Sequence, residues 1–166
     1  ICSAFFLALL TACGSSSQAV TGDTITSNNV NTRNAEILLK HSPVGTTELT
    51  WDANSSTLNV KIALTGLTPN SSHAAHIHAG TCTVDGAVIY PLKPVVANAR
   101  GDGTSETIIS NVRDGIPAQG WYINVHNGLL TSSIEHRPIS CGNVTSSDAS
   151  SKKEQSVRVV MTGTTA

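Results

Sequence analysis

Apolar and polar residues alternate along several short segments of this chain, and a two-residue period predicts β-strands. The clearest case is residues 58–64, whose even-numbered positions are Leu, Val, Ile and Leu. These four side chains would share one face of a strand and bury it against a core. Further strands are predicted at residues 35–40, 47–52, 74–79, 87–90, 104–109, 121–126 and 157–161.

Turn-forming residues separate these segments, notably at 52–56, 66–70 and 100–103. The strand at 87–90 is expected to end before Pro91 and Pro94, because proline cannot donate to a strand ladder. No segment has a convincing helical period. Seven or eight short strands with regular turns favour an all-β Greek-key sandwich or barrel.

Composition and charge narrow the possible partners. The chain has 166 residues, enough for one domain of ordinary size. Lys and Arg number 10 against 11 Asp and Glu, giving a formal net charge of -1. This balance provides no electrostatic basis for binding nucleic acid, which is not expected as a partner.

The N-terminus carries a short apolar run at residues 5–10, too short to span a bilayer and typical of a signal peptide. The following Leu-Thr-Ala-Cys at 10–13 resembles a bacterial lipobox, which implies cleavage before Cys13 and acylation of that cysteine. An ordinary secretory signal with a chance cysteine is the alternative. We therefore expect a signal peptide at 1–12, a lipidated Cys13 with a flexible polar tether to residue 34, and a β domain at 35–166.

An acylated Cys13 would make the lipid membrane a partner and place the protein in the cell envelope. Gly14 is not a residue that retains a lipoprotein at the inner membrane. The resemblance therefore implies the outer membrane or the cell surface.

The remaining cysteines are Cys82 and Cys141, because Cys2 and Cys13 belong to the signal region. Two cysteines in an exported domain most simply form a disulfide, although two buried free thiols are the alternative.

Three of the six histidines lie within six residues, at His73, His76 and His78. In a strand, His76 and His78 would share one exposed face, opposite the core. His126 would lie on the polar face of its own strand. If the two strands are neighbours, three imidazoles meet outside the core and could bind a metal. Solvated histidines are the alternative, and that interpretation is preferred for His41.

A resemblance to copper-zinc superoxide dismutases rests on Gly-Leu-Thr at 66–68, then His73, His76 and His78, then Cys82. Val-His at 125–126 is similar to their later copper-ligand strand. Residues 137–142 resemble their Arg-x-x-Cys-Gly segment with one extra residue, and the two domain cysteines match their disulfide. Residues 75–80 and 86–88 are still closer to bacterial CHRD domains, a module also found in chordin. The resemblance spans roughly residues 35–162 and implies a superoxide dismutase-like fold.

The resemblance implies a copper site formed by His76, His78 and His126. His73 would hydrogen-bond backbone and hold the strand rather than bind metal. His136 is a candidate fourth ligand, with a solvated side chain preferred. Arg137 is the candidate catalytic cation that would guide an anion to the site.

The chain departs from the dismutase pattern where zinc would bind. No histidine occurs between His78 and His126, and Arg100 falls near the position of the zinc aspartate. A zinc site is therefore not expected. The segment between His126 and Cys141 is also short, so the substrate-steering loop is reduced.

Three functions remain open from the sequence. The first is a copper protein of the envelope that dismutates superoxide. The second is a non-catalytic copper buffer that exchanges copper with a trafficking partner. The third is a metal-free interaction or adhesion module, in which the histidines are structural.

Overall fold

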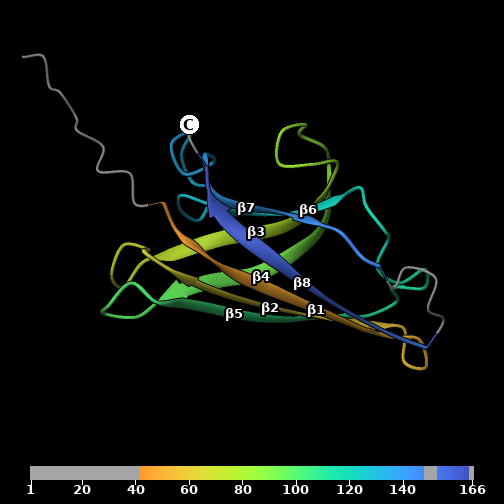
Figure 1. The fold of residues 1–166 in the computed structure, drawn as a ribbon. Coiled ribbons are helices and arrows are strands. Elements are labelled where there is room, and N and C mark those ends of the chain that lie inside the picture. The colour runs from red at the N-terminus through yellow and green to blue at the C-terminus, as the bar shows by residue number, and fades with distance from the viewer. Residues whose placement is uncertain (1–41, 148–152, 165–166) are drawn as a thin grey trace, which may run out of the picture. The chain divides into compact units, whose positions relative to one another are not determined.

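The alternating segments form the strands of an all-β domain in the computed structural model, which describes residues 42–147 and 153–164 (Figure 1). Eight antiparallel strands make one closed barrel, which confirms the all-β prediction and selects the barrel. The strands are β1 (Val44–Asp52), β2 (Thr57–Thr65), β3 (Ser72–Ala79), β4 (Val88–Ala97), β5 (Gly103–Ile109), β6 (Trp121–His126), β7 (Pro138–Val144) and β8 (Glu154–Gly163).

The hairpin of β1 and β2 follows the predicted alternation closely. Its ladder runs without a register shift from Val44↔Thr65 to Asp52↔Thr57. The four apolar side chains of residues 58–64 are all buried in the barrel core. Strict alternation therefore gives this hairpin its register, because a one-residue slip would turn every apolar side chain outward.

Strand order around the barrel is β1-β2-β5-β4-β3-β6-β7-β8, closing back on β1. The connections from β2 to β3 and from β5 to β6 each pass over two intervening strands, as in Greek-key folds. These crossovers place β3 beside β6, although His78 and His126 are far apart in sequence. In Figure 1, β6 and β7 lie along one side of the barrel and β1, β2 and β5 along the other.

β4 corrects the expectation that Pro91 ends its strand. The strand continues through Pro91 and Pro94 to Ala97. Its backbone ladder with β5 covers only the last two positions, from Val96 onward, so the prolines need not donate to β5 there. Hydroxyl side chains of β5 replace part of the missing ladder: the Lys93 amide donates to Thr107 Oγ1 at 2.9 Å.

β7 was not predicted from apolar periodicity. Its sequence, PISCGNV, holds few large apolar residues, yet most of the strand is buried. A Cβ at Gly142 would lie 2.6 Å from Val159 and 2.7 Å from Met161, so close packing against β8 requires glycine there. Because its buried residues are small, this strand lacks the alternation of large apolar and polar residues that predicts a strand from sequence.

The crossover at residues 110–120 packs against the ends of β1 and β8. The Trp51 indole donates to the Val112 carbonyl at 2.7 Å. Gln155 accepts from the Ile116 amide at 2.5 Å and donates to its carbonyl at 3.2 Å. The crossover thus satisfies buried backbone groups partly with side chains, and the Val112 amide donates to the Ser56 carbonyl at 2.9 Å.

Several predictions lie outside the described residues: the signal peptide, Cys13 and its lipid, the tether, the strand at 35–40 and His41. Within residues 42–147 and 153–164, no helix has the length and apolarity of a membrane span.

Candidate metal centre

The antiparallel pair of β3 and β6 brings the three predicted ligands together. In its register His76 lies opposite Asn124 and His78 lies opposite Tyr122. His126 follows two residues after Asn124, on the same side of the sheet. One potential ligand atom from each of the three imidazoles lies within 4.8 Å of the other two.

The histidines are less exposed than the sequence predicted. They lie outside the barrel core, but His78 and His126 retain only 9% and 7% of their exposed surface. His76 alone is partly exposed. The expectation of one exposed face is therefore wrong for two of the three residues. Alternation shows which side of a strand a residue takes, but it does not show that side to be in water.

Two backbone carbonyls hold the buried imidazoles. His78 Nδ1 lies 3.0 Å from the Gly86 carbonyl, and His126 Nδ1 lies 2.8 Å from the His136 carbonyl. Because a carbonyl only accepts, each Nδ1 carries a proton and donates it. In a neutral ring the lone pair is then on Nε2, the state that a metal requires.

The ring nitrogens that remain face one another. His76 Nδ1 lies 3.2 Å from His126 Nε2. His78 Nε2 is buried without a hydrogen-bond partner among the described residues. A buried polar atom without a partner is costly, and an ion is one of its ordinary explanations. The donor set that fits a metal is therefore Nδ1 of His76 with Nε2 of His78 and His126.

The site favours neutral imidazoles. Burial and, to a smaller extent, the neighbouring His126 and His78 together lower the pKa of His76 to about 4. Burial also lowers the pKa of His126, against the opposing effect of the His136 carbonyl. At neutral pH these two rings are therefore neutral imidazoles, and a cation need not first compete with the second proton of an imidazolium.

Tyr122 forms a wall of the site. Its ring stacks on His78, with centroids 4.9 Å apart and planes 22° apart, and it is only 2% exposed. Its hydroxyl makes a long 3.5 Å contact with Asp85. Burial raises the pKa of the Tyr122 phenol, so it stays neutral. Stacking and the Gly86 carbonyl together restrict the His78 ring.

The loop at residues 80–87 carries the Gly86 carbonyl and packs closely on β3. A Cβ at Gly86 would lie 2.0 Å from the Ala79 carbonyl oxygen, so only glycine fits without a shift. The Ala79 amide donates to the Ala87 carbonyl at 2.9 Å, and the Gly80 amide donates to Gly120 at 2.9 Å. The 80–87 loop is therefore tied to β3 and to the start of β6.

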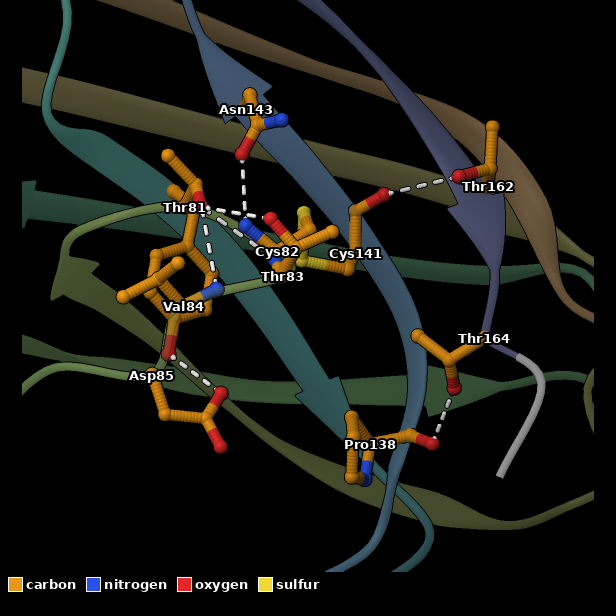
Figure 2. Close-up of a disulfide and its surroundings, with 11 residues drawn as sticks. Thr81, Cys82, Thr83, Val84, Asp85, Pro138, Cys141, Asn143, Thr162 and Thr164 are labelled. Carbon is orange, nitrogen blue, oxygen red and sulfur yellow. Dashed lines mark hydrogen bonds between the residues drawn. A yellow bond between two sulfur atoms is a disulfide. The ribbon is translucent and has the colours of Figure 1, made fainter.

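A disulfide ties the 80–87 loop to β7 (Figure 2). Cys82 and Cys141 are bonded, which confirms the predicted pairing over free thiols. The Cys82 amide also donates to the Asn143 side chain at 2.8 Å. Figure 2 shows both links, which join Cys82 to two residues of β7, Cys141 and Asn143. A covalent link thus fixes the segment that positions His78.

His73 contacts the backbone and does not belong to the group of three histidines. Its Nδ1 donates to the His126 carbonyl at 2.8 Å, and its Nε2 lies 2.7 Å from Ser71 Oγ. The side chain is 3% exposed. It joins β3 to the end of β6, where His126 is held.

His136 and Arg137 lie on the loop at residues 127–137. The His136 ring is exposed and bonds the Ser132 carbonyl at 2.8 Å, outside the group of three histidines. Arg137 is exposed, and its carbonyl accepts from the Asn127 amide at 2.9 Å. Of these two residues, the structure gives the site only the His136 backbone carbonyl.

The segment at the expected zinc position forms a closed turn. Asn98 Oδ1 accepts from the amides of Arg100 and Asp102 at 2.8 and 3.1 Å. Arg100 pairs with the Asp102 carboxylate at 3.1 Å. The Asp102 carboxylate is thus paired with the Arg100 guanidinium.

Sequence reasoning missed the backbone carbonyls of Gly86 and His136, which no side-chain pattern reveals. It also left Tyr122 and Asn124 without a role. The available signal was their alternation with His126 along one strand; the burial of both faces of β6 became visible only in the structure.

The antiparallel barrel thus carries on one side three convergent imidazoles that could hold a metal ion. The family model for the CHRD domain matches residues 16–129, and the chain belongs to this family. The matched range contains the three histidines and Gly86 and ends before β7 and β8. Neither a curated protein nor a solved structure matches the chain.

Proposed function

We propose that this CHRD protein binds one copper ion through His76, His78 and His126. The observation that carries the proposal is that the ring nitrogens of the three histidines face one another, with His78 Nε2 buried and unpartnered among the described residues. Two of the rings are oriented by backbone carbonyls before any metal arrives. Such preorganisation reduces the cost of binding.

Copper fits this donor set better than other biological cations. Calcium and magnesium require oxygen ligands, which the three histidines do not offer. Neutral imidazoles bind several transition metals, among which Cu(II) forms the tightest complexes with a given site. The resemblance of residues 66–82 to the copper-ligand strand of the dismutases supports the same choice.

A copper titration of the full chain tests this function. We expect one tightly bound equivalent of Cu(II), and a dissociation constant raised by more than about 100-fold when any one of the three histidines becomes Ala. His41→Ala is the matched control and should bind like the wild type. If the triple Ala variant keeps wild-type affinity, the metal-free interaction module replaces the copper protein.

Superoxide dismutation is a second candidate, favoured by the partial exposure of His76, which leaves one side of the group open. Copper there would supply a one-electron couple, oxidising one superoxide to dioxygen and reducing another, with two protons, to hydrogen peroxide. Stopped-flow decay of superoxide with the copper-loaded chain separates enzyme from buffer. If superoxide decays no faster than with the triple Ala variant, the protein is a copper buffer and not an enzyme. If Arg137→Ala lowers the rate, that residue guides the anion to the site.

The proposal includes export and lipid anchoring at Cys13. A disulfide persists in oxidising compartments, which supports a location in the envelope. Cys13→Ser should abolish incorporation of labelled fatty acid and release the protein from membranes. Membrane partition unchanged in that variant would contradict the anchor.

A further inference from the structure

Asn124 lies on β6, between β3 and β7, on the side of the barrel that carries the three histidines; we call this the metal side. It lies on the same side of β6 as His126, opposite His76 in β3 and opposite Cys141 in β7. Directly opposite residues in an antiparallel pair have Cβ atoms about 5 Å apart, and diagonal neighbours lie about 7–8 Å apart, which aromatic side chains such as histidine can span. The carboxamide is therefore beside His76 and diagonal to His78.

The Asn124 side chain is buried with one polar atom unpartnered. Asn124 is 7% exposed, and its Oδ1 is buried without a hydrogen-bond partner among the described residues. His78 Nε2, at the diagonal position, is unpartnered in the same way. A valine would fill the position without burying an unpartnered polar atom. One cation between the two atoms would satisfy both.

We infer that the Asn124 carboxamide oxygen is the fourth protein ligand of the metal centre. This inference rests on the proposed copper site and deepens it. An amide oxygen is a harder ligand than imidazole, so it stabilises Cu(II) relative to Cu(I). Asn124 thus sets how readily the bound copper is reduced, which is a property that the three histidines alone do not fix.

The test compares the full chain with Asn124→Leu, in which a side chain of similar size lacks the oxygen. Each protein is loaded with one equivalent of Cu(II) and examined by electron paramagnetic resonance. We expect an altered copper hyperfine splitting and a Cu(II) dissociation constant raised by about tenfold. Cu(I) affinity, measured by competition with a chelator, should change much less.

Asn124→Asp keeps an oxygen at this position and adds charge. It should bind Cu(II) at least as tightly as the wild type, with a shifted spectrum, and it carries the test if the Leu variant fails to fold. Asn59→Leu is the matched control. Asn59 also has a buried, unpartnered Oδ1, but it is on β2, which neighbours neither β3 nor β6. Its replacement should leave the copper spectrum unchanged.

The outcomes separate this inference from the proposed function. If both variants of Asn124 show the wild-type spectrum and Cu(II) affinity, while the triple histidine variant loses copper, the fourth ligand is refuted and the three-histidine site stands. If Asn59→Leu alters the spectrum as much as Asn124→Leu, a general structural effect replaces the ligand. A wild-type chain that binds no copper overturns both proposals.

Discussion

The outer faces on opposite sides of the barrel carry polar side chains in very different surroundings. Around β1 and β2, outward residues are in water and form a charged row that crosses four strands. Glu48 lies between Arg158 and Lys61 in the strand registers, with Arg158 3.7 Å away, and Lys61 lies 3.5 Å from Glu106. Exposed pairs of this kind contribute little to stability.

The outward residues of β6 are instead buried. Tyr122, Asn124 and His126 are covered, although they alternate with core residues in the same way as the charged row does. Burying polar groups outside the core costs free energy, and a stable sheet does not require it. The difference between the two sides makes β3 and β6 the candidate functional region, and the following predictions test that difference.

The largest effect is expected from removal of the disulfide, which joins the 80–87 loop to β7 on the metal side of the barrel. Replacing Cys82 and Cys141 together by Ala should lower the free energy of unfolding by about 4 kcal/mol, because the bond closes a long loop. Urea denaturation of the full chain measures the change. Glu48→Ala, in the charged row, should cost less than about 1 kcal/mol. A disulfide effect as small as the Glu48 effect would contradict the assigned role of the bond.

Removing Tyr122 tests whether the outer face of β6 is packed like a core. Tyr122→Ala should cost about 3 kcal/mol, since a buried aromatic ring is lost, and should weaken copper binding through His78. Lys61→Ala removes an exposed side chain from the opposite side and should cost less than about 1 kcal/mol. Equal losses in the two variants would remove the distinction between the two outer faces.

A substitution in the 80–87 loop should affect the metal more than the fold. Gly86→Ala forces the loop away from Ala79 and with it the carbonyl that orients His78. We expect the Cu(II) dissociation constant to rise by about tenfold. Val84→Ala, an exposed position in the same loop, is the control and should leave affinity unchanged. Similar affinities for both variants would exclude the carbonyl as an orienting group.

A pH dependence of stability is expected in the metal-free protein. The pKa of His76 is lowered to about 4 in the folded state, against 6.5 for an ordinary histidine. The unfolded chain therefore binds the extra proton first, and stability falls as the pH drops from about 6.5 to 4. His76→Gln should flatten this part of the profile, as followed by thermal unfolding with a chelator present. An unchanged slope would refute the lowered pKa.

The sequence predicted the β1–β2 side better than the metal side, for physical reasons. Residues 58–64 have one face in the core and one in water, so alternation reports both pairing and register. β4 and β7 lack that contrast. β4 tolerates Pro91 because its ladder with β5 begins only at Val96, and β7 needs Gly142 for close packing.

His76 and His78 could be paired from their spacing, and the resemblance to the dismutases added His126, but the surroundings of the three rings could not be predicted. Burial of His78 and His126 depends on segments that fold over β6, including the 80–87 loop held by Cys82. The tautomers depend on the carbonyls of Gly86 and His136, which are set by backbone positions alone. These features arise from tertiary contacts, which residue types along one chain do not encode locally.

The most direct test of the central claim is X-ray absorption at the copper edge on the full chain loaded with one equivalent of Cu(II). Outer-shell scattering from imidazole rings counts the histidine ligands. We expect three imidazoles per copper in the wild type and a loss of one in each of His76→Ala, His78→Ala and His126→Ala. A spectrum with one imidazole or none, or one that is the same in all four proteins, would contradict it.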